Sequence, residues 1–181
     1  MKKHAVWIMP REEAWDRLKE VVDELALAYG GPRFGPHVTL LGGIRARTAE
    51  TEKKLRDLAL SLEPFEVKLG RVDFLNEYYR CVFALVEDAG PESPIRRAYD
   101  RAFQAFAGDL VNAEERDFMP HLSLMYGDVS VEAKEEAVKQ LGGRLEVAFP
   151  VRSLYLAETD GRPEDWRTAG SFPLGGASRR R

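Results

Sequence analysis

The sequence repeats one short motif, and this repeat constrains the fold more than any other feature. His37 is followed by Val-Thr-Leu and His121 by Leu-Ser-Leu, and a proline stands directly before each histidine. The two copies lie 84 residues apart in a chain of 181 that contains three histidines in all. Because polar and apolar residues alternate in each copy, each is typical of a β-strand with one buried face. The repeat predicts two equivalent strands, one in each half of the chain.

The elements around the two motifs predict an internal duplication. In the first half, apolar periodicity and turn residues predict a strand at 6–9, a helix opening around Glu12, the histidine strand at 37–41, a helix from Thr48 and a strand at 65–74. In the second half they predict a strand at 79–86, a helix capped by Ser93, the histidine strand at 121–125, a helix capped by Ser130 and strands near 145–149, 151–157 and 167–172. Two similar α+β lobes would carry the histidine strands to facing positions across a central cleft. The same elements also fit an α+β domain without duplication.

Domain organisation and composition limit the classes of function. We expect residues 1–174 to form one bilobal domain and the basic tail 175–181 to be disordered. With 44% hydrophobic and 31% charged residues, the chain can bury a sizeable core. Its formal charge of −3 argues against DNA and other extended nucleic-acid surfaces, which require an excess of Lys and Arg, but permits a small anionic ligand.

The cysteine count and the apolar patterning predict where the protein works. Cys81 is the only cysteine, so the chain forms no internal disulfide, which fits a reducing compartment. No apolar stretch is long enough for a membrane span or a secretory leader. We therefore expect a cytoplasmic, monomeric protein with no membrane partner.

Each motif places a histidine and a hydroxyl group on the same face of its strand. Side chains alternate faces along a strand, so His37 and Thr39 point one way, as do His121 and Ser123, and same-face neighbours stand roughly 6.6 Å apart. If both pairs meet at one anion, one imidazole can deprotonate a water and the opposite imidazolium can protonate a departing ribose oxygen. The hydroxyl groups of Thr39 and Ser123 can donate to the non-bridging phosphate oxygens. The four residues predict the opening of a cyclic phosphodiester with no metal and no other cofactor.

Other uses of these residues remain open. Either histidine, taken alone, could be a structural residue. A zinc site would require a third ligand, which His4 could supply, but we interpret His4 as a surface residue. A nucleophilic Ser123 activated by His121 would place both residues on one strand, the wrong arrangement for a catalytic triad, and no Gly-x-Ser-x-Gly elbow is present.

Four segments resemble the 2H phosphoesterase superfamily and, within it, the plant and yeast type of cyclic phosphodiesterase. They are Gly-Pro-Arg-Phe-Gly-Pro-His-Val-Thr at 31–39, Phe-Met-Pro-His-Leu-Ser-Leu-Met-Tyr at 118–126, Val6-Trp7 with Pro10, and Cys81-Val82-Phe83. The resemblance implies a bilobal, duplicated fold with two antiparallel sheets flanked by helices. It also implies metal-independent hydrolysis of ADP-ribose 1″,2″-cyclic phosphate to ADP-ribose 1″-phosphate and of nucleoside 2′,3′-cyclic phosphates to 2′-phosphates.

The resemblance also assigns roles to residues. His37 and His121 match the catalytic histidines, with His121 as base and His37 as acid, and Thr39 and Ser123 match the phosphate-binding hydroxyl groups. Tyr126 matches an aromatic residue beside the second motif, and Trp7 flanks the cleft. The single cysteine departs from the disulfides of some plant members, and residues 76–80 differ in detail from the family.

Three further questions stay open at the level of the sequence. Trp7, Tyr126 and Tyr78 can stack on a nucleobase or pack as ordinary aromatic residues. Arg33, four residues before His37, can bind a second phosphate or remain a solvated loop charge. Besides small cyclic nucleotides, the substrate could be the 2′,3′-cyclic phosphate end of an RNA, and a non-catalytic module that binds a cyclic phosphate or RNA is a third interpretation.

Overall fold

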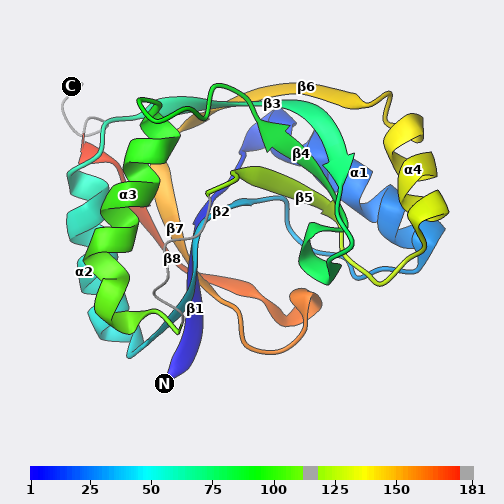
Figure 1. Ribbon diagram of the computed structural model, residues 1–181. Helices are drawn as coiled ribbons and strands as arrows, with labels where there is room; N and C mark the ends of the chain where they lie inside the picture. The colour runs from blue at the N-terminus through cyan, green and yellow to red at the C-terminus, as the bar shows by residue number, and fades with distance from the viewer. Residues whose placement is uncertain (112–117, 176–181) are drawn as a thin grey trace.

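The computed structural model describes residues 1–111 and 118–175, so all but the first residue of the predicted basic tail lies outside the described residues. Within these ranges the helices are α1 (Glu12–Tyr29), α2 (Thr48–Leu60), α3 (Pro94–Phe106) and α4 (Val131–Gln140), with short 3₁₀ helices η1 (Tyr78–Arg80), η2 (Ala107–Asp109) and η3 (Pro163–Asp165). The strands are β1 (Lys2–Ile8), β2 (Val38–Ala46), β3 (Phe65–Phe74), β4 (Val82–Val86), β5 (His121–Met125), β6 (Arg144–Val151), β7 (Ser153–Glu158) and β8 (Arg167–Pro173). The predicted α+β class is confirmed (Figure 1).

The described strands form one curled antiparallel sheet in the order β6-β3-β4-β5-β2-β1-β7-β8. This corrects the expectation of two separate sheets. The sheet has two halves of four strands each, β2-β1-β7-β8 and β6-β3-β4-β5. They join where β2 pairs with β5, through Val38 and Leu122. Strand β3 comes from the first half of the sequence but pairs with β4, from the second half. Strand β7 comes from the second half of the sequence but pairs with β1, from the first half. This exchange of strands ties the halves together and explains why no linker separates them.

Local sequence signals account for most element boundaries. Helix α1 ends at Gly30, which has a left-handed φ of 74° that a residue without Cβ adopts at little cost. The Ser93 and Ser130 side chains accept backbone N–H hydrogen bonds at the starts of α3 and α4, as predicted. The strand expected from residue 79 instead begins at Val82, because residues 78–80 turn into η1, where Arg80 donates two hydrogen bonds to the Glu77 carboxylate.

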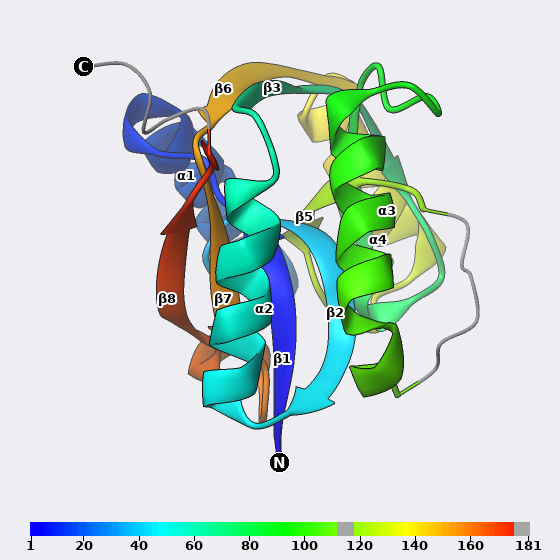
Figure 2. The same ribbon diagram turned by 90° about the vertical axis from the view of Figure 1, so that its left-hand side faces the viewer.

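The four helices cover one face of the sheet. Figure 1 shows α2 and α3 beside one half and α1 and α4 beside the other, and Figure 2 shows α2 and α3 running side by side on the half that contains β2, β1, β7 and β8. The main core includes the fully buried Val38 and Leu40 of β2 and Leu122 and Leu124 of β5. Since alternate residues of a strand face opposite ways, the residues between them point to the other face of the sheet. Among the helices of the described ranges, none has both the length and the apolar character required to cross a bilayer.

His4 corrects a second expectation. We predicted a surface residue, but its side chain is fully buried, because β1 lies between β2 and β7 rather than at an edge. Its Nε2 lies 3.3 Å from the Thr48 hydroxyl, and burial lowers its pKa below the ordinary value. Residues 1–111 and 118–175 contain no group of three or more His, Cys, Asp or Glu side chains arranged to hold a metal ion.

Candidate active site

The pairing of β2 with β5 brings the two sequence motifs together. Val38 and Leu122 are partners in this antiparallel pair. Continuing that register by one residue on each side sets His37 opposite Ser123 and Thr39 opposite His121, on the face away from the core. Side chains directly opposite each other have Cβ atoms about 5 Å apart, and diagonal neighbours such as His37 and His121 are about 7–8 Å apart. By this register the four polar side chains would occupy the corners of a quadrilateral of the size of one phosphate group with its ligands.

Both imidazole rings are held in the same way. The Nδ1 atom of His37 lies 2.7 Å from the carbonyl oxygen of Gly35, and the Nδ1 atom of His121 lies 2.8 Å from the carbonyl oxygen of Met119. A carbonyl oxygen can only accept a hydrogen bond, so each Nδ1 carries the proton and each neutral ring keeps an unprotonated Nε2. In both motifs the accepting residue precedes the proline, whose fixed φ holds that carbonyl in place.

The surroundings lower the pKa of both histidines. Burial lowers the pKa of His37 to about 4, the hydrogen bond to Gly35 opposes this shift, and the neighbouring His121 adds to it. Burial also lowers the pKa of His121, which is only partly buried; the Met119 carbonyl raises it, Arg80 lowers it and Glu77 raises it. A bound anion would favour protonation of one ring, since opposite charges stabilise each other at short range.

These shifts predict a loss of stability in mild acid. The unfolded chain has ordinary histidines and binds protons near pH 6.5, whereas folded His37 does so only near pH 4, so the unfolded state gains protons first as the pH falls. We expect the free energy of unfolding to fall by about 2 kcal/mol between pH 7 and pH 5 from His37, with His4 and His121 acting in the same direction. Urea unfolding at both pH values measures the change.

A glutamine variant is the control for this pH effect. His37→Gln should show a smaller difference in unfolding free energy between pH 7 and pH 5 than the unmodified protein. An equal difference in both proteins would mean that His37 titrates normally in the folded state.

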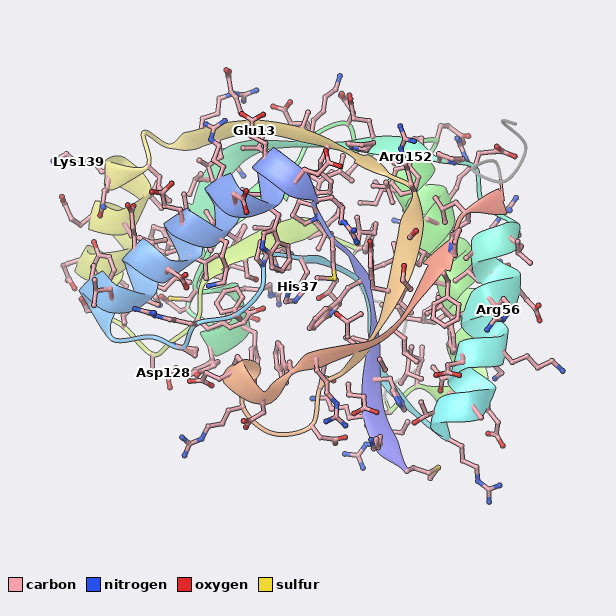
Figure 3. The ribbon with its side chains drawn as sticks, turned by 180° about the vertical axis from the view of Figure 1, so that it is seen from behind. Glu13, His37, Arg56, Asp128, Lys139 and Arg152 are labelled. Carbon is pink, nitrogen blue, oxygen red and sulfur yellow. The ribbon has the colours of Figure 1, made fainter. Side chains whose placement is uncertain are left out.

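Aromatic rings surround His37. Trp7, which pairs with Thr39 across β1 and β2, stacks on the His37 ring with 3.8 Å between ring centroids and 19° between planes. Phe34 and Trp166 meet the same imidazole edge-on, at 6.3 and 6.4 Å. In Figure 3, which shows the molecule from behind, His37 lies near the middle of the ribbon. The rings account for the 3% exposure of His37 and for its lowered pKa.

Tyr126 and Tyr78 belong to the same aromatic group. Tyr126 is buried and stacks on Phe34 at 4.0 Å, and Tyr78 lies 6.4 Å from Tyr126. Burial raises the pKa of Tyr126 above its ordinary value, and a hydrogen bond with Ser123 opposes the shift in part. Tyr126 therefore packs beside the second motif, and one face of its ring is covered by the Phe34 ring.

Sequence reasoning missed Trp166 and Tyr79. Trp166 follows η3 and stacks on Tyr79 of η1 at 5.8 Å, so that connections from opposite halves of the sheet meet beside His37. The indole N–H of Trp166 is buried and has no hydrogen-bond partner among the described residues. Nothing in the local sequence distinguishes Trp166 from a packing tryptophan, since its position depends on a contact with a residue 87 positions earlier.

The two hydroxyl groups differ in their surroundings. Ser123 is 5% exposed and its hydroxyl donates to the backbone carbonyl of Tyr79 at 3.2 Å, whereas Thr39 is exposed. Ser123 must therefore turn away from that carbonyl to donate to a ligand, and Thr39 need not.

Arg33 lies on the connection between α1 and β2, four residues before His37. It is exposed and makes no hydrogen bond or ion pair within the described parts of the chain, while its neighbour Phe34 is buried against the aromatic group. The binding of a second phosphate by Arg33 stays a prediction.

Comparison with known proteins agrees with the motifs. Residues 9–163 match the family model of the 2′-5′ RNA ligase superfamily. A cyclic phosphodiesterase of Arabidopsis thaliana is 28% identical over 172 residues, which cover 91% of each chain.

Solved structures share the fold at low sequence identity. TT0787 of Thermus thermophilus has a TM-score of 0.69 and 16% identity, over 96% of this chain and 98% of that one. Apo LigT of E. coli has a TM-score of 0.61 and 14% identity, over 96% of this chain and 97% of LigT. LigT complexed with 3′-AMP has a TM-score of 0.59. Because the family model spans most of the residues, the chain belongs to the 2′-5′ RNA ligase superfamily of 2H phosphoesterases.

Proposed function

We propose that this phosphodiesterase opens cyclic phosphate esters of small nucleotides. The substrates would be ADP-ribose 1″,2″-cyclic phosphate, giving ADP-ribose 1″-phosphate, and nucleoside 2′,3′-cyclic phosphates, giving 2′-phosphates. The observation that supports this most directly is the pairing of Val38 with Leu122, which brings the two motifs together with their similarly held imidazoles. The similarity to the Arabidopsis thaliana cyclic phosphodiesterase agrees with it. LigT, whose fold is shared, has been crystallised in complex with 3′-AMP, NADP⁺ and ATP.

The proposed mechanism uses the Nε2 positions of both histidines, one unprotonated and the other protonated when the substrate is bound. One histidine is neutral and accepts a proton from the attacking water, while the water oxygen forms a bond to phosphorus. The ester bond to the ribose oxygen breaks, and the other histidine, as imidazolium, protonates that oxygen. Thr39 and Ser123 donate to the non-bridging oxygens, where negative charge grows in the transition state. The product is a ring-opened phosphate monoester.

The two environments favour one assignment of acid and base. His37 lies under Trp7 and has the pKa of about 4, so it is the harder ring to protonate. Burial lowers the pKa of His121 as well, but this ring is partly exposed, and no ring is stacked face to face on it as Trp7 is on His37 among the described residues. We propose His37 as the base and His121 as the acid, the reverse of the roles that the resemblance implied.

A substrate panel tests the proposal. Purified protein is incubated with ADP-ribose 1″,2″-cyclic phosphate and with the four nucleoside 2′,3′-cyclic phosphates, and the products are identified by mass spectrometry and by migration against authentic monoesters. We expect turnover of these substrates with a bell-shaped pH profile and no loss of rate in EDTA, since imidazoles carry both proton transfers. Strong inhibition by EDTA would point to a metal-dependent reaction instead.

The family name favours RNA ends as a second candidate substrate. An oligonucleotide ending in a 2′,3′-cyclic phosphate is therefore included in the panel, and faster turnover of that oligonucleotide would identify RNA as the substrate. The net charge of −3 favours the small nucleotides. Tight binding without turnover would indicate a binding module.

The proposal also covers the compartment, the oligomeric state and the partners of the protein. We propose a cytoplasmic monomer that acts on small cyclic nucleotides, with RNA ends as the alternative and with neither DNA nor a membrane as partner. The lone, buried Cys81, whose pKa is raised by burial, fits a reducing compartment.

A further inference from the structure

A cavity of about 320 Å³ lies between the end of β1 and the start of α1. It is lined by Met9, Pro10, Arg11, Glu12, Trp15 and Tyr155. Two of the lining residues are aromatic, one is cationic and one is anionic, and none was singled out as a site residue from the sequence.

The cavity adjoins the His37 end of the quadrilateral. Tyr155 pairs with Trp7 across β7 and β1 and packs in one cluster with it, so its ring is on the same face of the sheet as the histidines. Trp7 in turn stacks on His37. On the other side, Trp15 lies so close to Gly35 that a Cβ there would come within 2.8 Å of the indole, and Gly35 provides the carbonyl that holds His37.

The Arg11 side chain and the Glu12 backbone are both constrained. Arg11 donates from Nη1 to the Tyr155 hydroxyl at 3.1 Å, which orients the guanidinium and the phenol together. Glu12 begins α1 with a φ of 53°, a left-handed conformation that is unfavourable for a residue with a side chain. Such conformations are found most often at sites where the surrounding structure has a reason to keep them.

We propose that this cavity, named here the distal subsite, binds a second nucleoside of the substrate, joined through phosphate to the ribose that carries the cyclic phosphate. This inference rests on the proposed function. The aromatic rings of Trp15 and Tyr155 suit a flat nucleobase. The Glu12 carboxylate suits ribose hydroxyl groups, which donate to it, and it balances the charge of Arg11, so the lining carries no excess positive charge to favour a phosphate. An uncharged nucleoside satisfies all three side chains.

The distance favours a second nucleoside over the one that reacts. The reacting phosphorus is expected over the boundary between β5 and β2, and Tyr155 stands on β7, beyond β2 and β1. With neighbouring strands 4.7–4.9 Å apart, this separation is about 12 Å. A base attached to the cyclised ribose would lie nearer the histidines, beside the aromatic group. The distal subsite therefore predicts that extended substrates react with a higher kcat/KM than mononucleotides.

The test compares three substrates in Glu12→Gln, Arg11→Met and unmodified protein. They are adenosine 2′,3′-cyclic phosphate, ADP-ribose 1″,2″-cyclic phosphate and a dinucleotide ending in a 2′,3′-cyclic phosphate. We expect each substitution to lower the ratio of kcat/KM for an extended substrate to that for the mononucleotide by about tenfold. Arg17→Met is the matched control, because Arg17 is on the same helix but hydrogen-bonds to the Glu146 carbonyl, outside the cavity. It should leave the ratio unchanged.

The three arms separate the outcomes. A lower kcat/KM ratio for the ADP-ribose substrate identifies a small dinucleotide as the source of the second nucleoside. A lower ratio for the dinucleotide alone identifies an RNA end. Either result supports the distal subsite. Unchanged ratios, or equal losses on all three substrates, would overturn it. Calorimetric titration with ADP-ribose, which lacks the cyclic phosphate, provides a readout without turnover. Binding weakened about tenfold by Glu12→Gln supports the subsite even if no substrate is hydrolysed, in which case only the proposed reaction fails.

Discussion

Replacement of either His37 or His121 by alanine is expected to lower kcat on cyclic nucleotides by about 10² to 10⁴, the usual effect of losing a general acid or base. In the proposed mechanism each ring presents Nε2 to the same phosphate, and no other imidazole of the chain can substitute, because His4 is buried beside Thr48. Initial rates at saturating substrate measure the effect, and circular dichroism verifies that the variants are folded.

His4→Gln is the control for this pair of substitutions. It removes a histidine from the same sheet but outside the quadrilateral, so kcat should remain near that of the unmodified protein at temperatures where the variant is folded. Nearly full activity in both His37→Ala and His121→Ala would refute the paired-histidine mechanism.

A substrate with a good leaving group separates the roles of the two histidines. An aryl phosphodiester expels a phenolate that requires little protonation, so loss of the acid should matter less for it than for a ribose ester. If His121 is the acid, His121→Ala should lose at least tenfold less activity on the aryl ester than on the cyclic nucleotide, whereas His37→Ala should lose similar activity on both. The opposite pattern would restore the roles implied by the family resemblance.

The repeated motif predicted the central part of the site because its information is local. Alternation of polar and apolar residues determines which side chains share a face of a strand. Because His37 and Thr39 are two residues apart, as are His121 and Ser123, each pair is predicted to share one face. Turn and capping residues, such as Ser93 and Ser130, fixed the helix starts for the same reason. The presence and order of most elements therefore followed from the sequence.

The other features depend on contacts between distant segments. The joining of both halves into one sheet rests on the pairing of Val38 with Leu122, and no local pattern specifies which edges meet. The burial of His4 follows from the return of β7 to the far side of β1. Trp166 lies on the connection that follows β7, and Tyr155 of the distal subsite lies on β7 itself, which pairs with β1. The positions of both residues depend on this pairing, so the residue types alone did not reveal them.

Removal of the Thr39 or Ser123 hydroxyl is expected to lower kcat by about 10² to 10³, as for the loss of one donor to a developing oxyanion. Thr39→Val keeps the shape of the side chain, and Ser123→Ala removes only the hydroxyl. Steady-state kinetics on a nucleoside 2′,3′-cyclic phosphate should show the loss in kcat with little change in KM, because the non-bridging oxygens gain charge chiefly in the transition state.

The two hydroxyl variants should also differ in stability. Ser123 donates to the Tyr79 carbonyl in the unliganded protein, so its removal leaves that carbonyl without this partner and should lower the free energy of unfolding by about 1 kcal/mol. Thr39 is exposed and its removal should cost less. Thr168→Val on β8, where the hydroxyl contacts only Met9 among the described residues, is the control and should retain kcat. A change confined to KM in both variants would mean that the hydroxyl groups bind the ground state and do not stabilise the transition state.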